Sequence, residues 1–382
     1  MKKSLLTLAI GSLVAGGAYA QSSVTLYGIA DASVHYTTNA DANNHGQTAM
    51  DDGAITQSRW GIKGSEALGN NLKAIFQLEN GYSLTNGKMN GSNTGQLFNR
   101  QAYVGLAGDF GAVKLGRQYT EGFNFFGDYD PLTIGNYTGN SWMYYSLTQL
   151  RRNNVVSYSG SFNGLDVGAS YGFGETPGSF TKAGGTPTTQ NQGSNTPYFG
   201  VRAAYTYGPF GVGGVYQEIR DPNGNKQQMW GAAGKYTIGP AKIFLGYIGG
   251  RDRTGQMDNI LNNAAVVTTT RNPAADTRGT AAANSNPRKD TLGYVGATYN
   301  VTPALALTGA FYADYVEGKN AIAGSDGKGR RYTAAFIAEY SLSKRTQLYG
   351  AADFNKVSGA TTTELPGRNN QTSFGAGIRH IF

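Results

Sequence analysis

The 382-residue sequence contains no cysteine and only three histidines, and charged residues make up only 15% of it. The absence of cysteine excludes a disulfide scaffold and a thiol-dependent enzyme. The histidines, His35, His45 and His380, are too far apart along the predicted strands and loops to form a catalytic triad or a histidine metal cluster. Beyond the first residues there is no long apolar run, which excludes a helical membrane protein because a spanning helix needs about 20 apolar residues.

Glycine and tyrosine are abundant instead, with 56 and 25 residues. The abundance of aromatic residues argues against a charged, disordered chain. So many glycines disfavour helix interiors. The composition therefore favours an ordered protein built from strands.

Residues 1–20 have the features of a secretory signal peptide. They combine the basic start Met1-Lys2-Lys3, an apolar stretch over Leu5–Val14 and the small-residue cleavage site Ala18-Tyr19-Ala20. The apolar stretch is too short for a membrane anchor. We predict that residues 1–20 are removed, that residues 21–382 form one domain, and that this domain resides in the periplasm or the outer membrane.

Apolar and polar residues alternate along most of the mature chain. The alternation is clearest over residues 57–63, 72–79, 165–174 and 347–354. A period of two is typical of strands with one apolar and one polar face.

Short turns and long polar segments follow one another between these strands. Seven short turns are predicted at 69–70, 108–109, 163–164, 208–209, 239–240, 302–303 and 343–344. Eight longer segments separate them, which gives sixteen strands of roughly 9–14 residues each, long enough to cross a bilayer at a tilt. The strands are predicted to begin near residues 22, 54, 71, 97, 111, 151, 164, 197, 210, 227, 241, 290, 304, 330, 345 and 371.

This pattern predicts an all-β fold, a transmembrane barrel of sixteen antiparallel strands. Closure pairs every backbone N–H and C=O group, as lipid requires. The apolar face would contact lipid, and a polar face of Gly, Ser, Thr, Gln and charges would line a wet lumen. A soluble sandwich of this size would need larger aliphatic residues on its inner face.

The basic residues of the strands are predicted to face the lumen. Arg or Lys on the lipid face at mid-depth costs about 2–4 kcal/mol. Alternation with apolar neighbours places inward the residues Arg59, Lys63, Lys73, Lys114 and Arg151. Alternation puts Arg100 on the same face as the apolar residues Val104 and Leu106. We nevertheless place Arg100 inward, because a charge facing lipid would be costly, and we expect the third loop to pack on those two neighbours.

The C-terminal residues Phe374, Ala376, Ile378, His380 and Phe382 share one face. This ending resembles the signature that the barrel-assembly machinery reads in outer-membrane proteins. The resemblance implies that His380 and Phe382 act as the assembly signal.

Several segments, taken in their order along the chain, resemble motifs of the Gram-negative general diffusion porins. They are Leu26–Gly28, Ser58–Gly64, Arg100–Leu106 and Gly111–Arg117, and the ending Gly377–Phe382 is similar to the betaproteobacterial branch. The resemblance covers the whole mature chain. It implies a homotrimer in the bacterial outer membrane, in which each barrel is a water-filled channel for passive diffusion of ions and small hydrophilic solutes. It implies no enzymatic activity.

The resemblance also implies a pore constriction. A basic cluster on the wall would consist of Arg59, Arg100 and Arg151, with Arg152 as the alternative to the last. The third loop would fold into the lumen, anchored by Phe123, Phe125, Phe126, Tyr129 and Trp142, and set its acids Glu121, Asp128 and Asp130 against that cluster. The loop has Asp130-Pro131-Leu132-Thr133 in place of the common Pro-Glu-Phe-Gly-Gly stretch, which leaves the acidic partners open. Alternatively, these charges are simply hydrated on the wall of a wide lumen.

An excess of inward Arg and Lys predicts weak to moderate anion selectivity. The alternatives are a substrate-specific channel, which would need an aromatic track or a dense anion ring, and a barrel that serves mainly as an adhesin or structural anchor. The expected partners are lipid and lipopolysaccharide, the assembly machinery and small solutes. Nucleic acid is not expected, because the basic residues are dispersed over a lumen face. No cofactor is expected, although Asp41, Asp51 and Asp52 could hold a calcium ion in the first loop.

Overall fold

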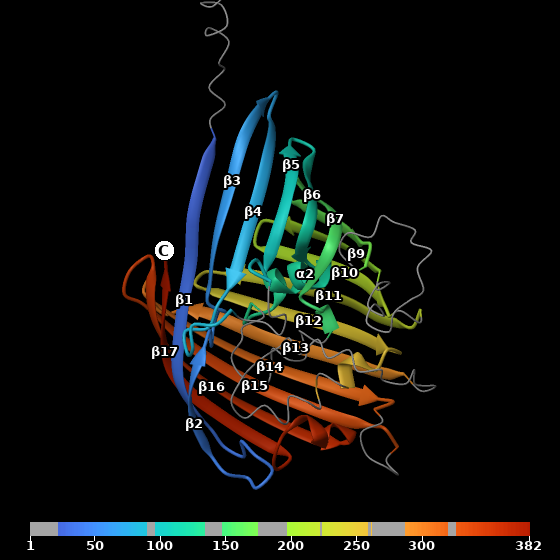
Figure 1. Cartoon of the computed structure of the whole chain (residues 1–382). Helices are drawn as coiled ribbons and strands as arrows, with labels where there is room; N and C mark the ends of the chain where they lie inside the picture. The colour runs from blue at the N-terminus through green and yellow to red at the C-terminus, as the bar shows by residue number, and fades with distance from the viewer. Residues whose placement is uncertain are drawn as a thin grey trace, which may run out of the picture.

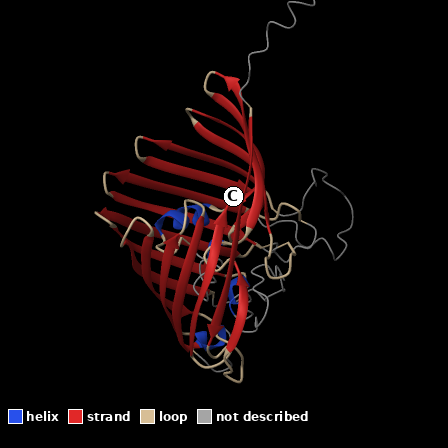
Figure 2. Ribbon diagram, turned by 90° about the vertical axis from the view of Figure 1, so that its left-hand side faces the viewer, coloured by secondary structure: helices blue, strands red, loops and turns tan. Residues whose placement is uncertain are grey.

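The computed structural model describes residues 22–89, 96–133, 147–174, 197–221, 224–258, 261, 287–319 and 326–382. The predicted signal peptide, residues 1–20, and Trp142 lie outside these residues. Figures 1 and 2 show the described chain as a sheet curled into a barrel. No helix in the described part of the chain is long and apolar enough to cross a membrane.

Sixteen antiparallel strands form the wall of the barrel. Each pairs with the wall strands before and after it, and the pairing of the first with the last closes the ring. The predicted barrel of sixteen strands is therefore confirmed. The wall strands are β1 (Ser23–Thr37), β3 (Arg59–Gly69), β4 (Leu72–Gly81), β5 (Gln101–Gly108), β6 (Gly111–Tyr119), β7 (Arg151–Phe162), β8 (Leu165–Gly172), β9 (Tyr198–Tyr207), β10 (Phe210–Arg220), β11 (Lys226–Ile238), β12 (Ala241–Asp252), β13 (Arg288–Asn300), β14 (Leu305–Glu317), β15 (Gly329–Ser341), β16 (Thr346–Gly359) and β17 (Asn370–Ile381).

An additional strand, β2 (Gln47–Asp52), was not predicted. It pairs with Ala32–Thr37 of β1, whereas β3 pairs with Ser23–Ile29 on the same edge. The first loop thus covers the part of β1 that β3 does not reach. The predicted start of β3 at residue 54 is wrong for the same reason, because residues 53–58 leave the sheet between β2 and β3.

The short turns have the backbone geometry that their residues favour. Asn163 and Gly164 both have positive φ, at 49° and 86°, and connect the paired residues Phe162 and Leu165. A two-residue hairpin loop with positive φ at both positions matches the twist of the flanking strands, and Asn-Gly adopts it at low cost. The turn therefore fixes the register of β7 against β8.

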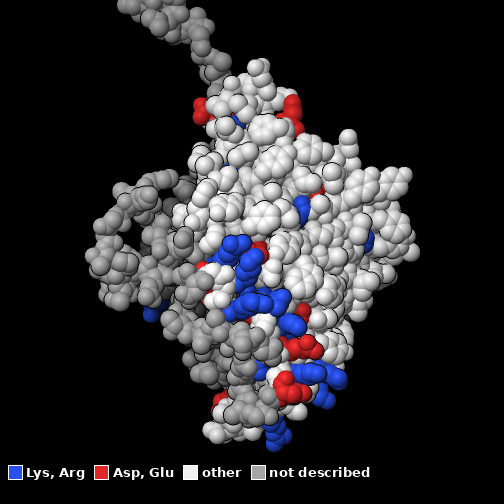
Figure 3. Space-filling view, turned by 90° about the vertical axis from the view of Figure 1, so that its right-hand side faces the viewer, with Lys and Arg blue, Asp and Glu red and all other residues white. Residues whose placement is uncertain are grey.

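The outer face of the barrel is apolar and exposed. Large hydrophobic side chains such as Leu245, at 65% exposure, point away from the wall on many strands. Figure 3 shows a broad surface with few charges beside a band of Lys and Arg that runs from the middle of the view to its lower end. Val104 and Leu106 belong to this face, with exposures of 59% and 45%, so the expectation that the third loop packs on them is wrong. Arg100 precedes β5, and strand alternation does not determine its direction.

The inner face carries the helix α2 (Glu121–Tyr129), which begins after the N-cap Thr120. The helix contacts β8, β9, β10, β11 and β12, and Figure 2 shows it among the strands. Phe125, Phe126 and Tyr129 are buried in a cluster with inward side chains that include Met229, Phe244, Ile248, Leu292 and Ile337. The expected polar inner face is therefore wrong for this part of the wall, where an apolar patch holds the helix.

A buried ion cluster joins the long-loop ends of β13, β14 and β15. Glu364, in the short helix η1 (Ala360–Glu364), accepts hydrogen bonds from Arg288 at 3.0 Å, Lys319 at 3.1 Å and Arg331 at 3.3 Å. Burial by itself would raise the pKa of Glu364, but the three cations lower it from 4.5 to about 2. The ionised carboxylate thus ties the last long loop to three strands.

The lowered pKa predicts an acid-dependent loss of stability. A carboxyl whose pKa is depressed on folding stabilises the fold above its unfolded pKa, and this stabilisation disappears as the pH falls towards the folded value. We expect the wild-type free energy of unfolding to drop by about 3 kcal/mol between pH 5 and pH 2 through this group. Glu364→Gln should lose this pH dependence and be less stable at neutral pH, because the three cations lose their carboxylate. Denaturant unfolding in detergent micelles measures both effects.

The exposed acid Glu317, at the end of β14, offers a matched control. Glu317→Gln should leave the pH profile unchanged. If Glu364→Gln also kept the wild-type dependence of stability on pH, the acid-dependent loss of stability would not come from Glu364.

Candidate functional site

Three arginines come together at Tyr119, at the end of β6: Arg59 begins β3, Arg151 begins β7 and Arg100 directly precedes β5. The Arg100 Nη2 atom donates a hydrogen bond to the Tyr119 hydroxyl at 2.6 Å. The Arg151 guanidinium lies 4.7 Å from the centre of the Tyr119 ring, and its Nη2 atom is 3.2 Å from the same hydroxyl. Arg59 lies close enough to both to experience charge repulsion. We call Arg59, Arg100 and Arg151 the arginine cluster.

One acidic residue pairs with the arginine cluster in the described part of the chain. Glu79 of β4 accepts a hydrogen bond from the Arg100 Nε atom at 2.6 Å, and both side chains are almost fully buried. Glu79 also accepts from the Tyr27 hydroxyl at 2.9 Å. A charge-assisted bond of this length fixes the Arg100 guanidinium in place.

Gln57 connects two members of the arginine cluster. Its backbone carbonyl accepts from the Arg59 Nε atom at 3.0 Å. Its side-chain oxygen accepts from the Arg100 Nη1 atom. The residue lies just before β3, in the segment that leaves the sheet.

The acids expected to face the arginine cluster are engaged elsewhere. Glu121 accepts from the Arg202 Nε atom at 2.8 Å and from the Ser170 hydroxyl. Asp130 is fully buried and accepts from the Tyr312 hydroxyl at 2.6 Å. The expectation that these two acids oppose the arginine cluster is therefore wrong, because β9 and β14 supply nearer partners.

The third expected acid, Asp128, is exposed on α2. The Lys235 Nζ atom lies 3.3 Å from its backbone carbonyl oxygen. Asp128 also lines the pocket described below.

The predicted lysines occupy different depths of the inner wall. Lys63 lies 5.3 Å from the Tyr27 ring centre, and Lys114 lies 5.3 Å from that of Tyr103. Lys73 is exposed near the short turn that joins β3 and β4. Arg152, the alternative to Arg151, is buried at 6% exposure and does not replace it beside Tyr119.

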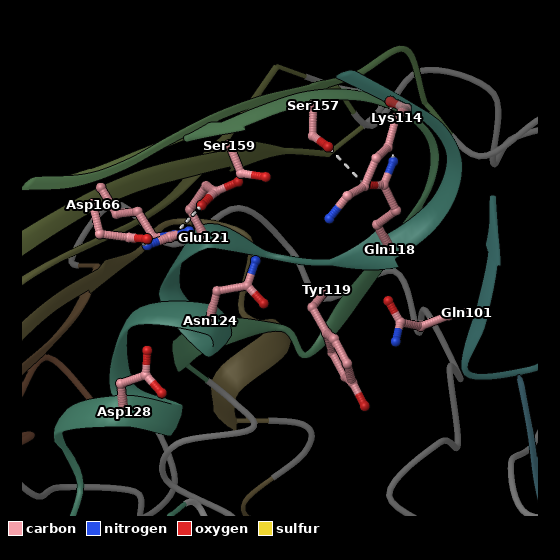
Figure 4. Close-up of a pocket in the computed structure, with 11 residues that line it drawn as sticks. Gln101, Lys114, Gln118, Tyr119, Glu121, Asn124, Asp128, Ser157, Ser159 and Asp166 are labelled. Carbon is pink, nitrogen blue, oxygen red and sulfur yellow. Dashed lines mark hydrogen bonds and ion pairs between the residues drawn. The ribbon is translucent and has the colours of Figure 1, made fainter. Parts of the chain in front are cut away.

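A polar pocket of about 290 Å³ lies between α2 and the wall. Figure 4 shows Asp128 and Asp166 at one side and Lys114 at the other. The lining residues are Gln101, Lys114, Gln118, Tyr119, Glu121, Asn124, Asp128, Ser157, Ser159, Asp166 and Arg202. This composition suits water and dissolved ions rather than an apolar ligand.

The predicted assembly signal lies at the seam of the barrel. Phe382 exchanges two backbone hydrogen bonds with Gly28, at 2.9 and 3.0 Å. A Cβ atom at position 28 would collide with the Phe382 ring, which explains the glycine there. His380 shares a hydrogen bond of 2.9 Å with the Thr346 hydroxyl. Recognition of these residues during assembly stays a prediction.

The first-loop acids considered for calcium have local roles. Asp41 accepts from the backbone N–H groups of Asn43 and His45 and lies 2.7 Å from the His45 ring nitrogen. Asp51 lies 3.7 Å from the ring nitrogen of His35. Within the described residues, no three or more His, Cys, Asp or Glu side chains are placed to hold a metal ion.

Comparisons with known proteins agree with this architecture. The profile of the Gram-negative porin family matches residues 6–360. An outer membrane porin of Bordetella pertussis is 30% identical, with 100% of each chain covered. An anion-selective porin from Comamonas acidovorans has a similar fold, with a TM-score of 0.70, 24% identity, and coverage of 94% of this chain and 100% of that one. The outer membrane protein OmpT of Vibrio cholerae, solved in a trimer form, has a TM-score of 0.63 at 15% identity, with 94% and 99% covered.

The match to the family profile spans nearly the whole chain, and the Bordetella relative aligns from end to end. The closed barrel and the polar pocket inside it are what a diffusion channel requires. The chain therefore belongs to the Gram-negative porin family, and it is an outer-membrane channel for passive diffusion rather than an enzyme.

Proposed function

We propose that this porin is moderately anion-selective and that its constriction lies between the arginine cluster and α2. The observation that carries the proposal is the charge imbalance at Tyr119, where, among the residues that the structure describes, three guanidinium groups meet one carboxylate, Glu79. Rings of Arg and Lys favour anions. Lys63 and Lys114 extend the positive wall, while Arg202 neutralises Glu121.

The position of the imbalance matters as much as its size. Charges in ordinary salt act over only about 8–10 Å, so only those at a narrow point discriminate between ions. The helix α2 reduces the open cross-section beside the arginine cluster, because Tyr119 stacks on Phe123 with ring centres 4.4 Å apart. The anion-selective porin from Comamonas acidovorans, which has a similar fold, supports the same reading.

Reversal potentials in planar bilayers test the proposal. Purified protein in a potassium chloride gradient should show a reversal potential of the sign that anion flow produces. Raising the salt concentration should weaken this preference, because the charges are screened. A preference for cations would overturn the proposal.

We also propose that the functional unit is a homotrimer in which each barrel has its own pore. The trimer form of the Vibrio cholerae protein supports this assembly. Migration on a denaturing gel, with and without boiling, tests it: a high-mass band should collapse to the monomer on boiling. A monomer band before boiling, from protein that conducts, would refute the trimer.

A further inference from the structure

Residues 53–58, between β2 and β3, fold inward and pack on the wall of the barrel. Ala54 is fully buried and Ile55 is 8% exposed. Both belong to the buried cluster that includes Tyr349 and Ala351 of β16. This inward segment therefore occupies the barrel interior at β1 and β16, apart from the strands that contact α2.

The buried residue Asp31 of β1 makes several of the hydrogen bonds that hold the inward segment, and Arg379 of β17 adds another, from its Nη1 atom to the Thr56 hydroxyl at 2.6 Å. Its carboxylate accepts from the backbone N–H of Thr56 at 2.8 Å and from the Tyr349 hydroxyl at 2.5 Å. Its backbone carbonyl accepts from the Gly53 N–H at 2.8 Å, and its backbone N–H donates to the Ser58 hydroxyl oxygen at 3.0 Å. Asp31 is fully buried, so these bonds do not compete with bulk water.

The inward segment leads directly to the arginine cluster. Gln57 follows Thr56, and it accepts from Arg59 through its backbone and from Arg100 through its side chain. The Asp31 carboxylate fixes the Thr56 amide, which fixes the position of Gln57. Hydrogen bonds at each end and the peptide bond between Thr56 and Gln57 thus connect a buried acid on β1 to two of the three guanidinium groups.

We propose that Asp31 is a positioning residue for the arginine cluster and acts through Thr56 and Gln57. The inward segment is then a second element of the constriction, on the side of the barrel away from α2. The inference rests on the proposed anion selectivity for its direction, since displaced guanidinium groups should discriminate less. Asp31 is negatively charged, yet we expect its removal to weaken the anion preference.

The sign of the change in anion preference on removal of Asp31 distinguishes a positioning role from a simple charge effect. If Asp31 were only a negative charge on the wall, removing it would increase anion preference. If Asp31 positions Gln57, its removal should decrease anion preference and widen the passage. The two readings predict shifts of opposite sign in the reversal potential.

Two substitutions at the same position separate charge from hydrogen bonding. Asp31→Asn removes the charge, but its carboxamide oxygen can still accept from Thr56 while its NH₂ group donates to the Tyr349 oxygen. Asp31→Ala removes the charge and the acceptor together. Gln57→Ala is the matched downstream variant, since it releases Arg100 and keeps the backbone bond to Arg59.

Each variant is reconstituted in planar bilayers, and its reversal potential and single-channel conductance are measured. We expect Asp31→Ala to lower the anion-to-cation permeability ratio by about twofold or more and to raise conductance. Gln57→Ala should shift both quantities in the same direction by less. Asp31→Asn should keep or slightly increase the wild-type ratio. Circular dichroism and heat-dependent gel migration verify that each variant forms the barrel.

The outcomes distinguish this inference from the proposed function. Equal reversal potentials and conductances for Asp31→Ala and Asp31→Asn would overturn the positioning role, whatever the selectivity of the wild type. A cation-preferring wild type would overturn the proposed function alone, because the difference between the two Asp31 variants would still report on positioning. If Asp31→Ala fails to assemble, Gln57→Ala decides: a wild-type ratio and conductance in that variant would overturn the path.

Discussion

Replacing Arg59 and Arg151 together by alanine is expected to abolish most of the anion preference and to raise single-channel conductance. The two substitutions remove two of the three positive charges beside Tyr119 and leave Arg100 paired with Glu79. Such a neutral pair contributes little field at the constriction, whereas the two guanidinium groups that have no carboxylate partner among the described residues contribute most of it. The side chains also occupy space, so their truncation widens the passage. Reversal potentials in a salt gradient and single-channel recordings measure the two effects.

Arg100 is left unchanged in this design because its loss would leave Glu79 buried without a cation. Breaking a buried ion pair costs about 3–5 kcal/mol, and misfolding would obscure the result. The matched control is Arg59→Lys with Arg151→Lys, which keeps both charges. That control should retain anion preference. If the double alanine variant retained it as well, the arginine cluster would not determine selectivity.

Truncating Phe126 is expected to loosen α2 and to enlarge the conductance. Phe126 is fully buried, with its ring 5.0 Å from that of Phe125 and 6.3 Å from that of Tyr294. Replacement of a buried phenylalanine by alanine costs about 3–5 kcal/mol. Polar contacts such as Asp130 with Tyr312 would still hold one end of the helix. We therefore expect a noisier and larger open-channel current from Phe126→Ala, with the barrel intact.

Two variants control for this result. Phe126→Leu keeps most of the apolar volume and should behave much like wild type. Phe311→Ala removes a ring from the exposed outer face and should leave the conductance unchanged. A wild-type current in Phe126→Ala would mean that the polar contacts alone position the helix.

The sequence was sufficient to predict the wall of the barrel. Alternation over residues such as 165–174 is a local property, imposed by a wall with two different faces, and most predicted strand starts lie within a few residues of those observed. The lysines and Arg59 could be placed inward for the same reason, since each alternates with apolar neighbours. Alternation did not place Arg100, which was placed inward only on the cost of a charge in lipid, because it lies before its strand and its direction depends on Glu79 and Gln57.

The partners of the acids could not be predicted, because they lie across the barrel. Glu121 and Arg202 are 81 residues apart in sequence, and Asp130 and Tyr312 are 182 apart. The apolar patch under α2 was equally hidden. In β13, inward Leu292 and Tyr294 alternate with Gly293 and the outward Val295, so the pattern does not tell which face meets the helix. Only closure of the barrel brings these residues, which are distant in sequence, close together in space.

The seam between β1 and β17 places the final residue of the chain against Gly28. Among the described strands, the other wall pairings join strands that follow one another along the chain. Hairpins can therefore form progressively, whereas the ring cannot close until the last 12-residue strand is present. A chain truncated before that strand would present two open edges to lipid, which offers them no hydrogen-bonding partner. The architecture thus makes completeness of the polypeptide a condition for stable residence in the membrane.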